Sequence, residues 1–109
     1  EDVSRTKDVV NALNKFGFKG EMARVSERSV RAGKGKHRGR RYVVKKGPLI
    51  VVSAEGSKLL KSARNIVGVD VAVVNRLNAH MLAPGTAPGR LTLFTASAIE
   101  RLAKEKLFT

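Results

Sequence analysis

The second half of the chain alternates between short apolar runs and stretches with helical spacing. Residues 49–52 read Leu-Ile-Val-Val, an unbroken and mostly β-branched run that is typical of a strand buried on both faces. Residues 69–74 and 91–94 also read as strands, and each strand is followed by a segment whose apolar side chains recur at helical spacing. Strands that alternate with helices pair in parallel through right-handed crossovers. We therefore expect a Rossmann-like, three-layer α/β fold with a mainly parallel sheet.

Local signals mark where the expected helices begin and end. Thr95 can cap the last helix, and Asn75 can cap a shorter helix before it. Longer helices are expected over residues 6–16, 57–65 and 96–107. Residues 20–30 fit either a strand and turn or a short helix, and both readings stay open. No strand precedes the first helix, as it would in an alternating α/β architecture. We therefore expect a single α/β domain over residues 1–109 that is incomplete at its amino-terminal end.

Residues 28–46, which we call the basic segment, carry nine Lys or Arg residues and no acid. Glycines between the charges let the backbone bend with little steric penalty. No periodic apolar face runs through the segment, so folding alone gives no reason for it, because it adds charge repulsion and buries little apolar surface. A polyanion would supply the reason. We expect a glycine-containing, RNA-binding loop that is mobile until RNA is bound.

The charge of the whole chain supports this interpretation. It has 22 Lys and Arg against 9 Asp and Glu, for a net charge of +13 and a pI near 11.0. Residues 24–46 alone contribute +9. Such a balance indicates a nucleic acid or an anionic membrane surface as partner. The basic segment lacks the interleaved Leu, Phe or Trp that would insert into lipid, which argues against the membrane.

Several classes of site lack support in the sequence. The absence of cysteine excludes disulfides, thiolate metal sites and cysteine nucleophiles, and there is no apolar run of membrane-spanning length, so we expect a cytoplasmic protein. Residues 53–57 read Ser-Ala-Glu-Gly-Ser, a poor phosphate cradle for a nucleotide. His37 and His80 lie far apart, which gives metal binding little support, and Ser53, Ser57, Ser62 and Ser97 lack a neighbouring histidine or acid that would suggest a catalytic triad. We expect no enzymatic activity, cofactor, metal or small-molecule substrate. Two alternative functions stay open: a nucleotide-binding α/β enzyme domain, and a general binder of polyanions or anionic membranes.

The nature of the RNA contacts follows from the scarcity of aromatic residues. Tyr42 is the only aromatic residue among the cations, so it could add one base stack or simply pack against the sheet. We therefore expect contacts mainly to phosphate and sugar, with recognition by RNA shape. The predicted RNA-binding residues of the basic segment are Arg28, Arg31, Lys34, Lys36, His37, Arg38, Arg40, Arg41, Tyr42, Lys45 and Lys46.

Several blocks of the sequence carry a resemblance to a known family. They read Arg-Ala-Gly-Lys-Gly-Lys at residues 31–36, Arg-Gly-Arg-Arg-Tyr at 38–42, Ala-Arg-Asn-Ile at 63–66, Leu-Ala-Pro-Gly at 82–85 and Pro-Gly-Arg-Leu-Thr at 88–92. In this order, and through essentially the whole chain, they resemble the large-subunit ribosomal protein L-four family in its archaeal and eukaryotic form. The resemblance implies a structural constituent of the large ribosomal subunit, located in the cytoplasm, that binds large-subunit ribosomal RNA and has no enzymatic role.

The resemblance also bears on partners and single residues. It implies contact with neighbouring large-subunit ribosomal proteins, without a membrane partner and without homo-oligomers. Arg90 joins the predicted RNA-binding residues because it lies in the matched block at residues 88–92, and Arg64 could equally bind RNA or cap its own helix. The family has an amino-terminal portion with an extended loop that reaches the peptide exit tunnel. We find no counterpart to it here, so we expect the chain to be the carboxyl-terminal part of such a protein.

Overall fold

Three short parallel strands form the centre of the fold in the computed structural model, which describes residues 1–108. The middle strand is β3 (Leu49–Val52), which pairs with β4 (Asp70–Val73) on one side and with β5 (Thr92–Phe94) on the other. All four residues of β3 are buried. The prediction of an α/β fold with a parallel sheet is confirmed, as is that of a central strand buried on both faces.

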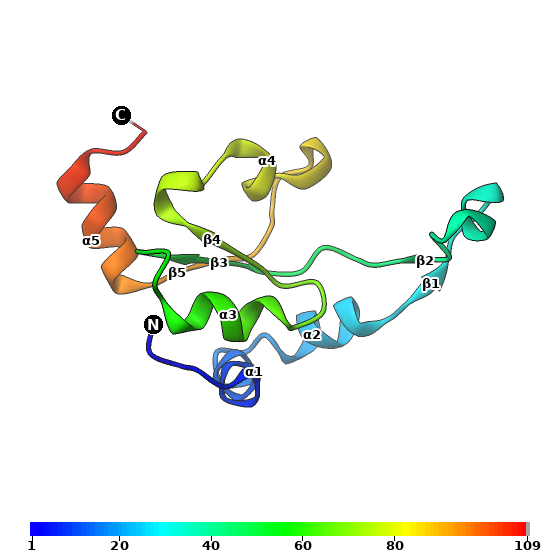
Figure 1. The fold of residues 1–109 in the computed structure, drawn as a ribbon, viewed down its shortest axis with the longest axis horizontal. Helices are drawn as coiled ribbons and strands as arrows, with labels where there is room; N and C mark the ends of the chain where they lie inside the picture. Colours follow the sequence, from blue (N-terminus) through cyan, green and yellow to red (C-terminus); the bar gives the residue numbers. More distant parts are fainter. Residues whose placement is uncertain (109) are drawn as a thin grey trace.

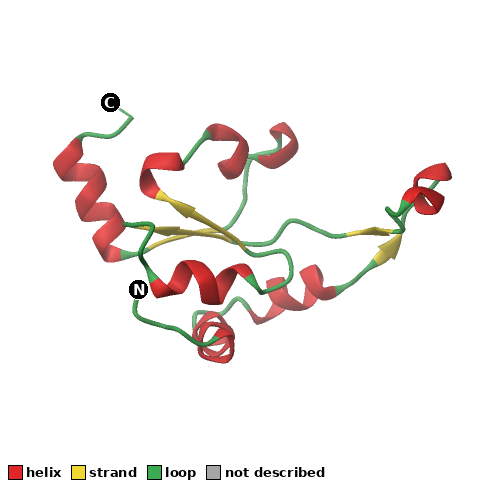
Figure 2. Ribbon diagram, in the orientation of Figure 1, coloured by secondary structure: helices red, strands yellow, loops and turns green. Residues whose placement is uncertain are grey.

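Helices cover both faces of this sheet (Figures 1 and 2). The α-helices of the described residues are α1 (Thr6–Lys15), α2 (Lys19–Ser26), α3 (Lys58–Arg64), α4 (Ala79–Leu82) and α5 (Ala96–Glu105). Three short 3-10 helices are also present: η1 (Lys34–Arg38), which lies away from the sheet, η2 (Val74–Arg76) and η3 (Pro84–Thr86). Successive side chains of a strand point to opposite faces. Ile50 and Val52 therefore pack with α1 and α3, whereas Leu49 and Val51 pack with Ala98 of α5.

The helix caps confirm one prediction and correct another. The Thr95 side chain accepts a hydrogen bond from the Ala98 amide at 3.3 Å, so Thr95 caps α5 as predicted. The predicted cap at Asn75 was wrong: Asn75 lies inside η2, and it is Asn78 that accepts from the Met81 amide, at 2.9 Å. The reason is that Leu77, the residue after η2, is extended, so no continuous helix runs from Asn75 onward.

The basic segment contains two short strands and a 3-10 helix where the sequence predicted only a loop. Residues 20–30, left open above, form most of α2 and then the strand β1 (Ser29–Val30), which pairs antiparallel with β2 (Tyr42–Val43). Between these strands lies η1, flanked by Gly33 and Gly39, whose φ angles of 78° and 74° favour glycine. Figure 1 shows this hairpin projecting away from the sheet, and the molecule measures 49 × 32 × 24 Å as a result.

The base of the basic segment is fixed to the core. Val25 of α2 is 1% exposed and packs against Gly47 and Gly68. The Gly47 amide donates a hydrogen bond of 2.8 Å to the Gly68 carbonyl. A Cβ at Gly68 would lie 2.0 Å from the Val25 side chain, so only glycine fits there. Arg24 also donates a hydrogen bond of 2.7 Å to the carbonyl of Lys46. The hairpin therefore projects from a rigid base.

A carboxylate occupies the carboxyl-terminal end of the sheet. Glu1 accepts hydrogen bonds from the Ser53 amide at 2.9 Å, the Ser53 hydroxyl at 2.7 Å and the Thr95 and Ser97 hydroxyls at 2.6 Å each. Burial alone would raise the pKa of Glu1, but the hydrogen bonds from Ser97, Thr95 and Ser53 lower it to about 2. These contacts join the start of the chain to the ends of β3 and β5.

This carboxylate makes the stability of the fold depend on pH. Because the pKa of Glu1 is lowered on folding, its contribution is complete above an unfolded value near 4.5 and is lost as pH falls toward 2. We expect Glu1→Gln to destabilise the chain by about 1 kcal/mol near neutral pH, since solvent screens this largely exposed group. Thermal unfolding of both proteins between about pH 6 and pH 2 should show the difference vanish at the acid end. Asp2→Asn serves as the control, and a difference that stayed constant with pH would contradict the assignment.

Candidate nucleic-acid interface

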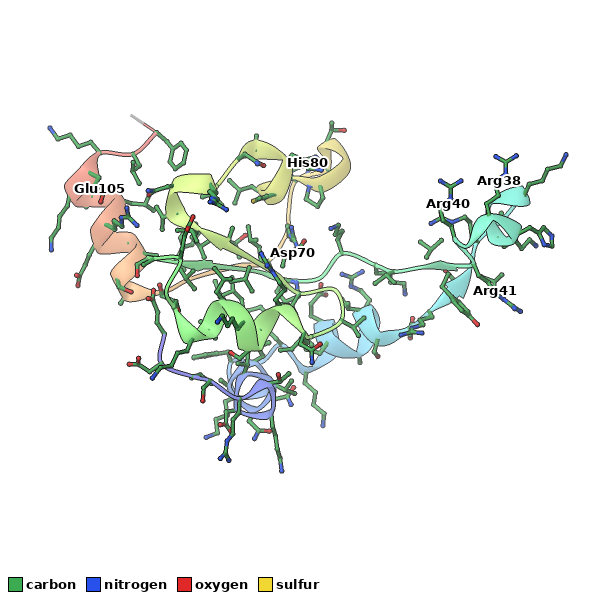
Figure 3. The ribbon with its side chains drawn as sticks, viewed as in Figure 1. Arg38, Arg40, Arg41, Asp70, His80 and Glu105 are labelled. Carbon is green, nitrogen blue, oxygen red and sulfur yellow. The ribbon has the colours of Figure 1, made fainter. Side chains whose placement is uncertain are left out.

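The outer part of the basic segment carries cations that have no acidic partner. Within residues 1–108, no ion pair involves Arg28, Arg31, Lys34, Lys36, Arg38, Arg40 or Arg41. All of them are exposed except Arg31, which is half-buried. Figure 3 shows Arg38, Arg40 and Arg41 spread around the end of the hairpin, far from Asp70 and Glu105. The positive charge is therefore concentrated where the protein itself offers nothing to neutralise it.

Backbone contacts hold the tip in shape. The Arg31 amide donates to the Arg41 carbonyl at 2.7 Å, which extends the pairing of β1 and β2 by one step. The Arg31 side chain crosses the hairpin, where its Nε donates to the Arg40 carbonyl at 2.9 Å. Gly35 leaves room for this crossing, because a Cβ there would lie 3.0 Å from the Arg31 side chain. Arg31 is thus partly a structural residue of the tip.

Tyr42 lies on the hairpin rather than against the sheet. It is 49% exposed and pairs with Val30 across β1 and β2. The guanidinium groups of Arg28 and Arg41 lie 5.9 and 5.8 Å from the centre of its ring, within cation–π range. Because both guanidinium groups lie over the ring, a base that stacked on Tyr42 would share the ring faces with Arg28 and Arg41.

Two of the predicted residues lie at the base of the hairpin and have acidic partners. Lys45 is 2.8 Å from a Glu27 carboxylate oxygen, and Lys46 is 3.3 Å from an Asp70 carboxylate oxygen. Both lysines keep part of their side chain exposed, at 39% and 63%. They can still contact an anion, but part of their charge is already neutralised within the protein.

Arg90 is placed differently from the other predicted residues. Its side chain is 6% exposed and its guanidinium donates to the Gly47 carbonyl at 2.8 Å, the Met81 carbonyl at 2.8 Å and an Asp70 carboxylate oxygen at 2.6 Å. Burial alone would raise the pKa of Asp70, but the hydrogen bonds from Arg90 and Lys46 lower it. Arg90 thus ties β4, α4 and the base of the basic segment together, and we leave it out of the candidate interface.

The two histidines also lie apart. His37 is exposed in η1, at the tip of the basic segment, and His80 is exposed in α4 on the core. No group of three or more potential metal ligands forms within residues 1–108. In the same range, no helix combines the length and apolar character needed to cross a membrane.

The chain is similar to known proteins over almost its whole length. A family model described as the ribosomal protein L4/L1 family matches residues 2–105. A protein of Nanoarchaeum equitans, named large ribosomal subunit protein uL4, is 46% identical over 108 residues, which cover 99% of this chain and 40% of that protein. Proteins with the same name from Sulfolobus acidocaldarius and Methanoculleus marisnigri are 48% and 50% identical, covering 94% of this chain and 39% and 40% of their own lengths. The chain thus spans about 40% of the length of these relatives.

Proposed function

The chain belongs to the ribosomal protein L4/L1 family, and from that membership we propose that it is a structural part of the large ribosomal subunit that binds large-subunit ribosomal RNA. The proposed contact surface is the basic segment, with the residues from Arg28 to Tyr42 as its main part and Lys45 and Lys46 at its base. Neighbouring large-subunit proteins are further proposed partners, and the proposed location is the cytoplasmic ribosome. We propose no enzymatic role.

The observation that carries this proposal is the set of seven cations on the hairpin without an acidic partner in the described residues. Each phosphate that such a cation neutralises releases condensed counterions. A plot of log affinity against log salt concentration therefore falls with a slope of about 0.7 to 0.9 per phosphate contact. Arginine can also donate two hydrogen bonds to one phosphate. Because Arg38, Arg40 and Arg41 spread around the end of the hairpin, this end suits a site between RNA segments better than a flat RNA surface (Figure 3).

The two alternative functions have less support. In open parallel sheets a nucleotide phosphate binds beyond the carboxyl ends of the strands, at the start of a helix. Here the Glu1 carboxylate occupies that place beside Ser53 and Thr95. An anionic membrane would attract the same cations, but η1 carries no bulky apolar side chain to insert into lipid. We also propose that the sheet is of Rossmann-like type, supported by its parallel pairs and the helices on both faces.

The proposal is tested by measuring binding across a salt series to large-subunit ribosomal RNA and to a generic RNA duplex of equal length. We expect tighter binding to the ribosomal RNA that persists at high salt, because a shaped site adds contacts that do not depend on counterion release. Vesicles of anionic lipid serve as the control for charge alone. Equal affinities for both RNAs that collapse together as salt rises would contradict a specific ribosomal RNA site in this chain.

A further inference from the structure

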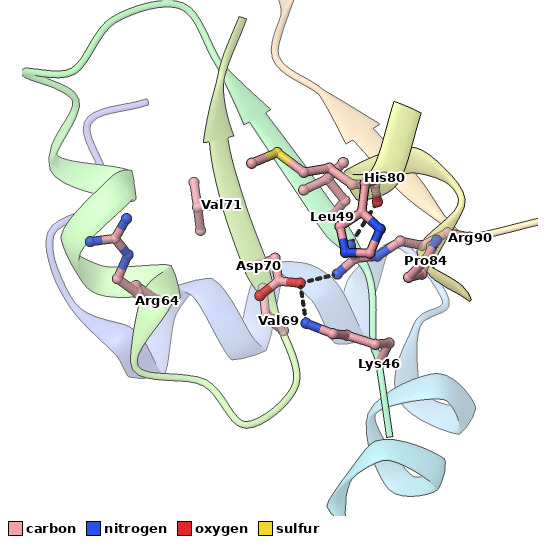
Figure 4. Close-up of a pocket in the computed structure, with 10 residues that line it drawn as sticks. Lys46, Leu49, Arg64, Val69, Asp70, Val71, His80, Pro84 and Arg90 are labelled. Carbon is pink, nitrogen blue, oxygen red and sulfur yellow. Dashed lines mark hydrogen bonds and ion pairs between the residues drawn. The ribbon is translucent and has the colours of Figure 1, made fainter. Parts of the chain in front are cut away.

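A groove runs along the outer edge of β4, on the core of the protein and apart from the hairpin. Two adjoining cavities of about 350 Å³ each form it, and both are lined by Arg64, Val71 and Met81. Each volume falls within the range of small-molecule sites in proteins. Figure 4 shows the first cavity, with Arg64 on one side of β4 and His80 and Arg90 on the other.

The floor of the groove presents free backbone groups. The Asp70 amide donates to Pro48 at 3.2 Å, so Asp70 and Ala72 direct their backbone groups toward β3. Backbone groups alternate in direction along a strand, so those of Val71 and Val73 point away from β3. Within residues 1–108, no other strand pairs with β4 on that side. The groove therefore offers an ordered N–H donor and C=O acceptor at Val71, beside apolar side chains.

The rim of the groove is mostly cationic. The side chain of Arg64, the last residue of α3, is exposed and makes no hydrogen bond or ion pair among the described residues, and the same holds for the side chain of His80 in α4. Lys46 lies at the same cavity, 63% exposed and held by Asp70 at 3.3 Å. A guanidinium plane can stack on an unpaired base, and an ammonium can bind a phosphate. The groove thus combines an apolar floor, a donor and acceptor pair, and cations at its edge.

We propose that this groove binds one unpaired nucleotide of RNA. The base lies on Val71 and Met81 beneath the Arg64 guanidinium, and the backbone phosphate lies near Lys46. This inference rests on the proposed RNA-binding function, but it adds a second contact that recognises single-stranded RNA, separate from the phosphate contacts proposed for the hairpin. The groove is lined by four Lys or Arg residues against two acids, Asp70 and Glu55, and this excess of positive charge favours RNA over an extended peptide on the same strand edge.

The test compares Arg64→Ala with Lys61→Ala, which removes the same charge from the same helix outside the groove. The probes are a single-stranded RNA of mixed sequence of about ten nucleotides and a duplex of the same length. We expect Arg64→Ala to weaken single-strand binding about tenfold and duplex binding less than about twofold, because base stacking is lost only in the first case. Lys61→Ala should affect both RNAs equally. In the unsubstituted chain, the Val71 amide should become protected from hydrogen exchange when the single strand binds.

The possible failures can be told apart. If Arg64→Ala and Lys61→Ala weaken both RNAs to the same degree, Arg64 contributes only charge and the groove inference is overturned. If duplex binding is intact and neither variant changes single-strand binding, the inference that the groove binds a nucleotide is also overturned. An extended peptide would then be the ligand to test at the free edge of β4. A chain that binds neither these probes nor ribosomal RNA overturns the proposed function together with the groove.

Discussion

Replacing Arg38, Arg40 and Arg41 together by alanine is expected to weaken binding to large-subunit ribosomal RNA about 100-fold at moderate salt. These side chains surround the exposed end of the hairpin and make no ion pair in the part of the chain that the structure describes (Figure 3). If each contacts one phosphate, the slope of log affinity against log salt should fall by about 2 to 3. Filter binding or fluorescence anisotropy across a salt series measures both quantities.

The same variant should keep its fold, because none of the three arginines is buried and the hydrogen bond accepted by the Arg40 carbonyl belongs to the backbone. We expect an unchanged helical circular dichroism signal and an unchanged melting temperature. A matched control, Lys58→Ala with Lys61→Ala and Lys104→Ala, removes the same charge from α3 and α5. An equal loss of affinity in that control would mean that only net charge matters, and a loss of helical signal in the first variant would contradict the separation of binding from folding.

Arg90→Ala is expected to destabilise the fold by about 3 kcal/mol, because it leaves two backbone carbonyls without their side-chain donor and removes the nearer of the two cations that the Asp70 carboxylate contacts, leaving only Lys46. For a domain of this size, the melting temperature should fall by roughly 12 to 20 °C. Thermal unfolding followed by circular dichroism measures the change. RNA affinity, measured at a temperature where the variant is folded, should change little.

Arg76→Ala is the matched control for that substitution. Arg76 also pairs with a carboxylate, Glu55 at 2.6 Å, but both side chains are largely exposed, at 73% and 65%. Exposed pairs of this kind contribute little, so we expect less than about 1 kcal/mol. If Arg90→Ala instead melted like the unsubstituted chain and lost RNA affinity, Arg90 would contact RNA as its sequence block implied, and the structural role would be wrong.

The sheet could be predicted from sequence because its signals are local. The apolar run from Leu49 to Val52 and the capping hydroxyl of Thr95 each act within a few residues. Residues 20–30 could not be decided, because the short helix α2 buries only Val25 and so has no clear apolar face. The error at Asn75 has a similar cause, since an asparagine in a 3-10 turn and one that caps a helix look alike in sequence.

The candidate site was predicted in part for the same physical reason. A dense run of cations without acids can be seen in sequence, so the hairpin residues could be named. What each cation contacts could not be seen, because the partners of Arg90 lie 9, 20 and 43 residues away. Likewise, the Glu1 carboxylate meets Thr95 only after the whole sheet has formed.

The order of the strands along the chain has a consequence for synthesis. The hairpin is complete once Val43 has been made, and its antiparallel strands need only a local turn to pair. Central strand β3 comes next, but both of its neighbours, β4 and β5, are made later, and the second is complete only at Phe94. Parallel pairs also form more slowly than local contacts. During synthesis from the amino-terminal end, the hairpin that we propose as the RNA contact is therefore complete while the central strand of the sheet still lacks both of its neighbours.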